Sequence, residues 1–156
     1  METIEYSDKP GEYDGVLDFF KVIDSYYYPQ LSKRCSLREF IDPVIKEGNI
    51  IYIKEKGKII AMITYFYFNE KFNSAYIDTI SIIKDHRRKG LGKMLIDKCL
   101  KDLKSKDIGL VKLRTWSTNE ITTRFYPKIG FKVSKVVKND RGKGIDSIYY
   151  EKKLWG

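Results

Sequence analysis

Cysteine and histidine are scarce in this chain, whose 156 residues include two cysteines and one histidine. Cys35 and Cys99 are far apart in the sequence and match no metal-ligand spacing or redox motif, so we expect two reduced thiols and no metal site. No apolar run approaches the roughly 18–20 residues that a membrane-spanning helix needs. The acidic N-terminus lacks the apolar segment of a signal peptide, so we expect a cytoplasmic protein without a membrane partner.

The charge of the chain is strongly positive. Lysine and arginine number 30 against 21 aspartates and glutamates, which gives a formal net charge of +9. This excess suits a phosphorylated cofactor, a nucleic acid or an anionic membrane. The sequence has no RNA-binding aromatic motif, zinc-finger spacing or basic heptad region, so we do not expect nucleic acid as the partner. The densest basic cluster surrounds two glycines, which favours a compact phosphate group, and it contains Lys84, His86, Arg87, Arg88, Lys89 and Lys93.

Hydrophobic periodicity predicts strands and helices in alternation along the chain. The predicted helices cover residues 14–27, 36–47, 89–104 and 119–128. Ser36 is the expected N-cap of the second helix, and Pro43 is expected to kink or restart it. The predicted strands cover residues 3–6, 49–54, 58–69, 75–83, 110–116, 131–137 and 147–154. The order indicates an α/β domain with a mixed central sheet of about six to seven strands flanked by about four helices.

Residues 80–95, with the sequence ISIIKDHRRKGLGKML, are the part of the chain most informative about chemistry. A predicted strand leads there through a short loop into a predicted helix, with Arg87, Gly90 and Gly92 at the joint. The first turn of a helix has unpaired N–H groups and a positive dipole end, and glycines let an anion approach that backbone closely. The segment therefore predicts a pyrophosphate cradle, whereas a solvated, charged helix start is the alternative.

Two blocks of the sequence resemble the GNAT superfamily of N-acetyltransferases. Arg87-Arg88-Lys89-Gly90-Leu91-Gly92 matches its Arg/Gln-x-x-Gly-x-Gly/Ala signature, and Ile80 and Ile82 match the end of the preceding strand. Leu113, Asn119 and the run from Phe125 through Tyr126 to Gly130-Phe131 resemble its Asn…Tyr-x-x-x-Gly-Phe segment. The resemblance covers about residues 50–154 and implies one N-acetyltransferase domain over residues 1–156, with residues 1–48 on the acceptor side and residues 50–154 as the acetyl-CoA-binding core.

The resemblance also implies an activity. An acetyl group passes from acetyl-CoA to a primary amine of a small molecule or peptide by direct attack in a ternary complex, without an acyl-enzyme. The backbone of Ile80 and Ile82 is then expected to bind the pantetheine arm of acetyl-CoA. The residues expected to bind its phosphates are Arg87, Arg88, Lys89, Gly90, Leu91, Gly92 and Lys93.

Three further residues are assigned roles on the same ground. Tyr126 matches a tyrosine that contacts the cofactor and protonates the departing thiolate, and a packing role is the alternative. Asn119 matches a cofactor-contacting asparagine, and it also suits a helix N-cap. Asp78 is the expected general base, directly or through water, because it shares the strand parity of Ile80; an ion-paired or surface aspartate is the alternative. His86 is expected to be a solvated loop residue.

The acceptor is less well defined by the sequence. We expect its pocket to draw on the first two helices and on residues 62–68. The first 24 residues carry seven acidic and two basic side chains, which favours an acceptor that is cationic when free. The resemblance leaves a homodimer open as well, because dimerisation is common in the superfamily. The competing functions are a non-catalytic acyl-CoA-binding module and a nucleic-acid-binding protein.

Overall fold

The computed structural model describes residues 3–7, 12–68 and 73–155. Its α-helices are α1 (Tyr13–Ile23), α2 (Leu37–Glu47), α3 (Leu91–Ser105) and α4 (Glu120–Lys128). Its strands are β1 (Thr3–Ser7), β2 (Asn49–Glu55), β3 (Lys58–Phe68), β4 (Ser74–Ile82), β5 (Leu110–Trp116), β6 (Lys132–Gly142) and β7 (Ile145–Lys153). Short 3₁₀ helices are η2 (Asp24–Tyr26), η3 (Leu31–Lys33) and η4 (Lys84–His86). The order of strands and α-helices is the predicted one.

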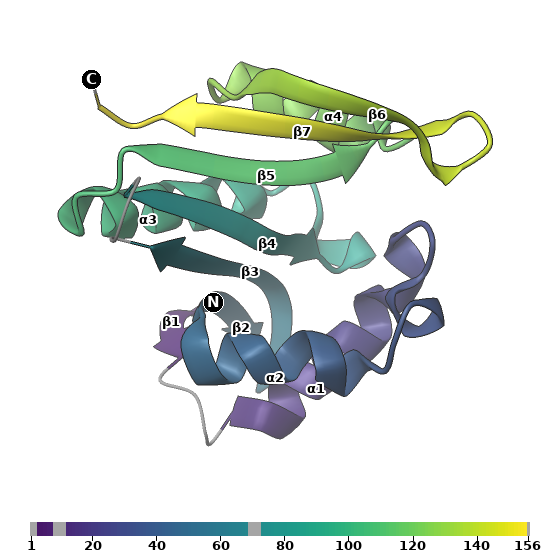
Figure 1. Cartoon of the computed structure of the whole chain (residues 1–156). Helices are drawn as coiled ribbons and strands as arrows, with labels where there is room; N and C mark the ends of the chain where they lie inside the picture. Colours follow the sequence, from purple (N-terminus) through teal and green to yellow (C-terminus); the bar gives the residue numbers. More distant parts are fainter. Residues whose placement is uncertain (1–2, 8–11, 69–72, 156) are drawn as a thin grey trace. The chain divides into compact units, whose positions relative to one another are not determined.

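The strands follow one another in the order β1-β2-β3-β4-β5-β7-β6 (Figure 1). Strands β4 and β5 pair in parallel, with Ser74 opposite Leu110 and Tyr76 opposite Lys112. The pairs β1–β2, β2–β3, β5–β7 and β6–β7 are antiparallel. The predicted α/β fold with a mixed central sheet is therefore confirmed.

By its contacts the chain divides into two compact units. The first unit is Met1–Phe66 with Asp78–Asp102, and the second is Tyr67–Ile77 with Leu103–Gly156. The boundary passes through β3, β4 and α3. The single domain over residues 1–156, with an acceptor-side segment and a cofactor core, stays a prediction.

In the first unit, β2 and β3 are buried on both faces. Ile50, Ile51, Tyr52 and Ile53 are all buried, although successive residues of a strand point to opposite faces. Such continuous burial requires cover on both sides. Helices α1 and α2 pack on the face that carries Ile50 and Tyr52. The Tyr65 hydroxyl of β3 donates to Asp102 of α3, so α3 contacts β3 as well.

Helix α2 differs in two details from its prediction. The Ser36 hydroxyl donates to Glu39 Oε1 at 3.3 Å, and no side-chain bond from Ser36 reaches the backbone of the helix. Pro43 lies inside α2 without interrupting it. Proline has no N–H, so Pro43 removes only the backbone hydrogen bond to the carbonyl of Glu39, in the first turn of the helix. The apolar side of α2 stays packed through Ile41 and Val44.

In the second unit, the two faces of β5 differ. Val111, Leu113 and Thr115 are buried, whereas Lys112 and Arg114 are exposed. Helix α4 packs on the buried face, where the hydroxyls of Thr115 and Thr122 are 2.7 Å apart. Lys112 and Arg114 therefore lie on a face of the sheet that is open to solvent.

The hairpin between β6 and β7 is tighter than predicted. The predicted strands end at residue 137 and resume at residue 147, but β6 continues to Gly142, which pairs with Ile145. The pairing register of β6 with β7 shifts between Val137 and Gly142. This irregularity lets the strand include polar residues that have no direct partner on β7.

Candidate active site

The loop between β4 and α3 is shaped by two residues with left-handed backbone. Arg88 has φ 64° and Gly90 has φ 76°. A right-handed helix cannot include such residues, so α3 begins at Leu91 and not at Lys89 as predicted. The carbonyl of Gly90 accepts the N–H of Met94 at 3.1 Å, which makes Gly90 the N-cap residue of α3.

The first turn of α3 fits a bound anion. The N–H groups of Leu91, Gly92 and Lys93 precede the first intrahelical bond of α3, and no acidic residue occupies this turn. A Cβ placed on Gly90 would meet no atom within 4 Å, so the space beside its backbone is open. These features suit the phosphates of a nucleotide cofactor.

The cations of this loop and of the first turn of α3 are not equivalent. Arg88 and Lys89 are exposed, and neither makes an ion pair with any residue that the structure describes. Lys93 Nζ lies 2.8 Å from Asp97 Oδ2 within α3. Arg87 is partly buried, and its Nε donates to the carbonyl of Ile82 at 3.1 Å. Arg88 and Lys89 are therefore the cations best placed to meet a phosphate, and Arg87 ties the loop to the end of β4.

Two tyrosines after α1 contact this loop and strand, a role that was not predicted for them. The Tyr26 ring centroid is 4.8 Å from the Arg87 guanidinium carbon and 5.6 Å from Lys84 Nζ. The backbone N–H of Lys84 donates to the Tyr26 hydroxyl at 3.2 Å. The hydroxyls of Tyr27 and Ser81 are 2.9 Å apart. The N-terminal part of the chain thus braces the segment on which the phosphate loop is built.

His86 is not the solvated loop residue that the sequence suggested. Its Nε2 lies 3.0 Å from Glu55 Oε2, at the end of β2. Its Nδ1 is buried and has no hydrogen-bond partner among the described residues. The sequence could not show this contact because it joins residues 31 positions apart, at the β2–β3 turn and in the phosphate loop.

Strand β4 carries the other expected residues of the first unit. Asp78 is exposed, while Ile80 and Ile82 are partly buried. Ser81, which contacts Tyr27, lies between the two isoleucines. The contacts from Tyr27 and Arg87 therefore fix the stretch whose backbone we expect to bind the cofactor.

Asn119 and Tyr126 lie in the second unit. The Oδ1 of Asn119 accepts the N–H of Thr122 at 3.2 Å, which confirms Asn119 as the N-cap of α4. Its amide NH₂ donates to no described residue and stays available to a ligand. Tyr126 is 3% exposed, and its ring centroid lies 5.8 Å from that of Phe131 and 5.5 Å from that of Tyr150. Packing therefore fixes the direction of its hydroxyl.

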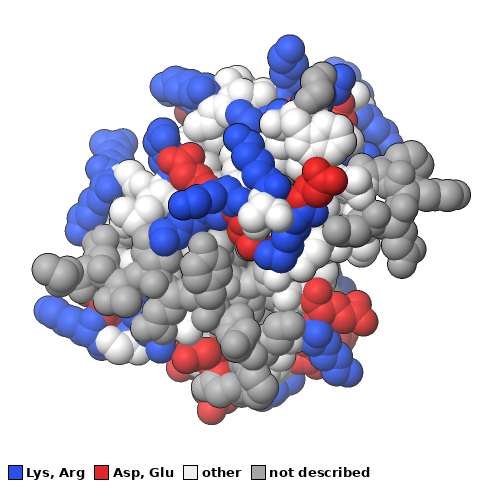
Figure 2. All heavy atoms as spheres, turned by 90° about the vertical axis from the view of Figure 1, so that its left-hand side faces the viewer, with Lys and Arg blue, Asp and Glu red and all other residues white. Residues whose placement is uncertain are grey.

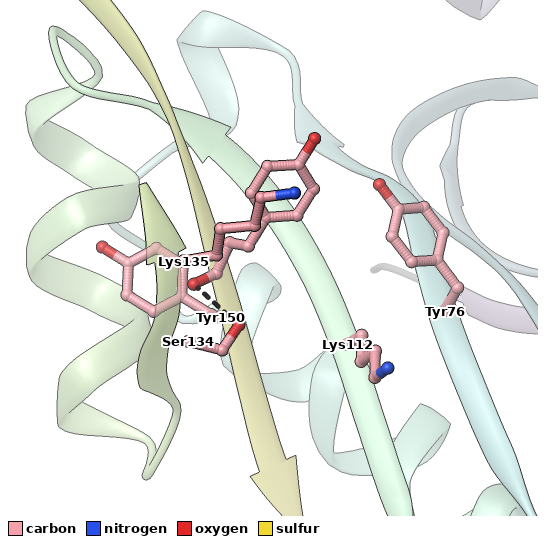
Figure 3. Close-up of a pocket in the computed structure, with 6 residues that line it drawn as sticks. Tyr76, Lys112, Ser134, Lys135 and Tyr150 are labelled. Atoms are coloured by element: carbon pink, nitrogen blue, oxygen red, sulfur yellow. Dashed lines mark hydrogen bonds between the residues drawn. The ribbon is translucent and has the colours of Figure 1, made fainter. Parts of the chain in front are cut away.

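A cavity of about 310 Å³ opens on the second unit. It is lined by Tyr76, Lys112, Ser134, Lys135, Tyr149 and Tyr150. These residues come from β4, β5, β6 and β7 (Figure 3). An acceptor pocket on the first two helices and residues 62–68 stays a prediction. Polar and apolar residues alternate over residues 110–116. This alternation indicates that Lys112 and Arg114 lie on the face of β5 opposite the core.

The comparison that decides the family covers most of the chain. A sequence model described as the Acetyltransferase (GNAT) family matches residues 16–131. This span includes the phosphate loop, Asn119 and Tyr126. The chain belongs to the GNAT acetyltransferase family.

Solved structures show the same GNAT fold over nearly the whole chain. The ribosomal-protein-S18-alanine N-acetyltransferase from Escherichia coli is 17% identical, with a TM-score of 0.80 and coverage of 100% of this chain and 96% of that one. An N-acetyltransferase from Staphylococcus aureus is 17% identical, with a TM-score of 0.77 and 99% coverage of both chains. A GNAT family acetyltransferase from Elizabethkingia anophelis with acetyl-CoA bound is 18% identical, with a TM-score of 0.70 and 97% coverage of both chains.

Membership of the GNAT family makes acetyl transfer the general activity. Acetyl-CoA is the matching co-substrate, and the open, cationic start of α3 fits its phosphates. Within the described part of the chain, no cluster of three histidine, cysteine, aspartate or glutamate residues is arranged to hold a metal ion. The helices in residues 12–68 and 73–155 are all too short or too polar to cross a membrane.

Proposed function

We propose that this protein is an acetyl-CoA-dependent N-acetyltransferase that acetylates a primary amine of a small molecule or peptide. The observation that carries the proposal is the start of α3, where unpaired N–H groups, an open Gly90 and two unpaired cations coincide. Backbone N–H groups and fixed cations together are how proteins bind pyrophosphate. The main chain of Ile80 and Ile82 would hold the pantetheine arm, and the amide of Asn119 would add a contact to the cofactor.

We propose direct attack as the chemical route. The amine nitrogen forms a bond to the thioester carbon, the carbon–sulfur bond breaks, and the products are an acetylated amine and CoA. Asp78 accepts the proton that the amine loses, directly or through water. Tyr126 donates a proton to the departing thiolate, and packing against Phe131 and Tyr150 holds its ring in one orientation for that step.

The two cysteines support a route without an acyl-enzyme. Burial raises the pKa of the Cys99 thiol far above its usual range, and the carboxylate of Asp102 adds to the effect. Partial burial and the neighbouring Glu39 also raise the pKa of Cys35. Both thiols therefore stay protonated near neutral pH, and the protonated form is a poor nucleophile.

Among the described residues, the face drawn in Figure 2 carries no long basic track. On the face drawn in Figure 2, the lysine and arginine side chains are scattered, with aspartate and glutamate side chains between them. A nucleic-acid partner is usually met by a basic patch or stripe. The loop cations, in contrast, are grouped around a helix start that can take a compact phosphate.

The test of the proposed function is turnover of acetyl-CoA with a panel of primary amines, read by thiol release. Calorimetry with acetyl-CoA, run on the same preparation, measures cofactor binding separately. We expect binding together with amine-dependent thiol release. Binding without turnover on any amine would indicate an acyl-CoA-binding module, and the absence of binding would overturn the proposal altogether.

A further inference from the structure

The open face of the second unit carries a pocket with an unusual set of side chains. Two lysines and three tyrosines line it together with Ser134, and no acidic residue is among them. We propose that this pocket binds an anionic group of the acceptor, so that the acceptor is an amine that also carries a carboxylate or phosphate. This inference rests on the proposed function, because it assigns the pocket to the acceptor of that reaction.

One cation of the pocket, Lys135, shares an aromatic ring with Arg114, which lies outside the lining. Lys135 Nζ lies 5.3 Å from the Tyr149 ring centroid, and the Arg114 guanidinium carbon lies 5.8 Å from it. Arg114 also donates to the Tyr149 hydroxyl at 3.4 Å. Cations held by a ring lose less freedom when an anion binds between them. Tyr149 therefore gathers positive charge at one wall of the pocket.

Lys112 supplies charge from the neighbouring strand. It is exposed, and its side chain makes no hydrogen bond or ion pair with any described residue. Figure 3 shows Lys112 on β5 and Tyr76 beside it on β4. A lysine without a protein partner can meet a ligand anion without first breaking another bond.

Glu151 and Asp140 lie near this face, and Asp78 shares the β4 face of Tyr76, but none of the three lines the cavity. Glu151 pairs with Lys112 in the β5–β7 register, but no ion pair within 4.0 Å joins the two side chains. Asp140 Oδ2 accepts the Ser147 hydroxyl at 2.6 Å. The side chains that line the cavity therefore carry two positive charges and no negative charge.

The three tyrosines make the pocket suitable for an apolar or aromatic part of a ligand as well as for its anionic group. Burial raises the pKa of Tyr150, so its phenol stays neutral at ordinary pH. The Ser134 hydroxyl donates to the carbonyl of Tyr149 at 3.3 Å, at the register shift between Val133 and Lys135. Phenol rings provide apolar surface with a polar edge, which suits a small organic acid better than a hydrated inorganic ion.

Strand β4 links this pocket to the proposed chemistry. Alternate residues of a strand point to the same face, so Tyr76 and Asp78 are neighbours on one face, about 7 Å apart along the strand. Tyr76 lines the pocket, and Asp78 is the proposed general base. The inferred acceptor carries an anionic group for the pocket of the second unit and an amine that is cationic when free.

The test uses matched pairs of amines that differ only in the anionic group. Phenylalanine is compared with phenethylamine, and phosphoethanolamine is compared with ethanolamine, by thiol release. The test variants are Lys112→Gln, Lys135→Gln and the double variant. Lys138→Gln is the control, because it removes an exposed positive charge from the same strand β6 without touching the pocket.

We expect the anionic member of at least one pair to be the better acceptor. The double variant should raise the KM of that member about three- to tenfold, since exposed charge pairs contribute modestly, and leave its uncharged partner unchanged. If the phenylalanine pair shows this difference, the acceptor carries a carboxylate; if the phosphoethanolamine pair shows it, the acceptor carries a phosphate. Equal use of charged and uncharged amines, or an equal effect of Lys138→Gln, would overturn the inference.

A binding measurement separates this inference from the proposed function. Phenylalanine and phosphoethanolamine are titrated into labelled protein, and the amide shifts of β5 and β7 are followed by NMR. Shifts that vanish in the double variant support the pocket even if no amine is acetylated. Turnover of uncharged amines without such shifts would leave the proposed function standing and remove this inference.

Discussion

Replacing Gly90 by alanine tests whether the start of α3 binds the phosphates of acetyl-CoA. Gly90 has φ 76°, and a Cβ there would meet no protein atom within 4 Å. The added methyl therefore costs only backbone strain within the protein, about 1–2 kcal/mol for a left-handed alanine. It also occupies the space through which an anion reaches the backbone. We expect acetyl-CoA affinity to fall at least about tenfold, or about 1.4 kcal/mol.

The chain offers a matched control for the strain. Gly144, in the β6–β7 turn, has φ 78° and equally open surroundings. The Gly144→Ala variant should lose similar stability, which lowers Tm by about 2–4 °C per kcal/mol in a chain of this size, and keep full affinity. Calorimetry with acetyl-CoA measures the affinity, and thermal unfolding with and without acetyl-CoA checks both variants. Arg88→Gln should lower the affinity less than Gly90→Ala, by about threefold. Equal affinity in the two glycine variants would refute the phosphate assignment of the loop.

Three further outcomes are expected. Tyr126→Phe should lower turnover at least about tenfold with nearly unchanged acetyl-CoA affinity, because it loses the acidic proton and keeps the packed ring; unchanged turnover would leave Tyr126 a packing residue. Tyr26→Phe should weaken acetyl-CoA binding slightly and Tyr26→Leu more, since only the second also loses the ring over Arg87; identical affinities in calorimetry would contradict the brace. The rate of Cys35 alkylation should rise only at a higher pH than for an ordinary thiol, because the pKa of Cys35 is raised. Cys99 should react only after unfolding, and mass spectrometry of the labelled chain shows whether Cys99 is modified in the folded protein.

Much of the fold was predictable because local patterns and tertiary packing agree. The alternation in β5 and the apolar stripe of α3 both follow the side that each element buries. The start of α3 was misplaced for a local reason, since periodicity cannot show that Arg88 and Gly90 have left-handed backbone. The length of β6 was underestimated because its polar residues look like a turn, whereas a register shift holds them in the strand.

The site was predictable only where it is written in a contiguous motif. The phosphate loop is one short segment, so its residues could be named from the sequence. The braces from Tyr26 and Tyr27 join residues that are 58 and 54 positions apart. Their aromatic character indicated burial in the core, and nothing local distinguishes a core tyrosine from one that holds a loop. The lysines of the pocket were hidden for the same reason, because their grouping depends on strand order.

Strand β6 has a consequence for how the protein behaves at high concentration. It ends the strand order, spans Lys132–Gly142, and exposes Val133 at 54% and Val136 at 46%. A long edge strand of this kind invites another copy to add a strand of its own. Lys132, Lys135 and Lys138 recur every third residue, and the two register shifts bend the edge. Like charges and an irregular edge oppose such pairing, so part of the positive charge of this chain protects it from aggregation.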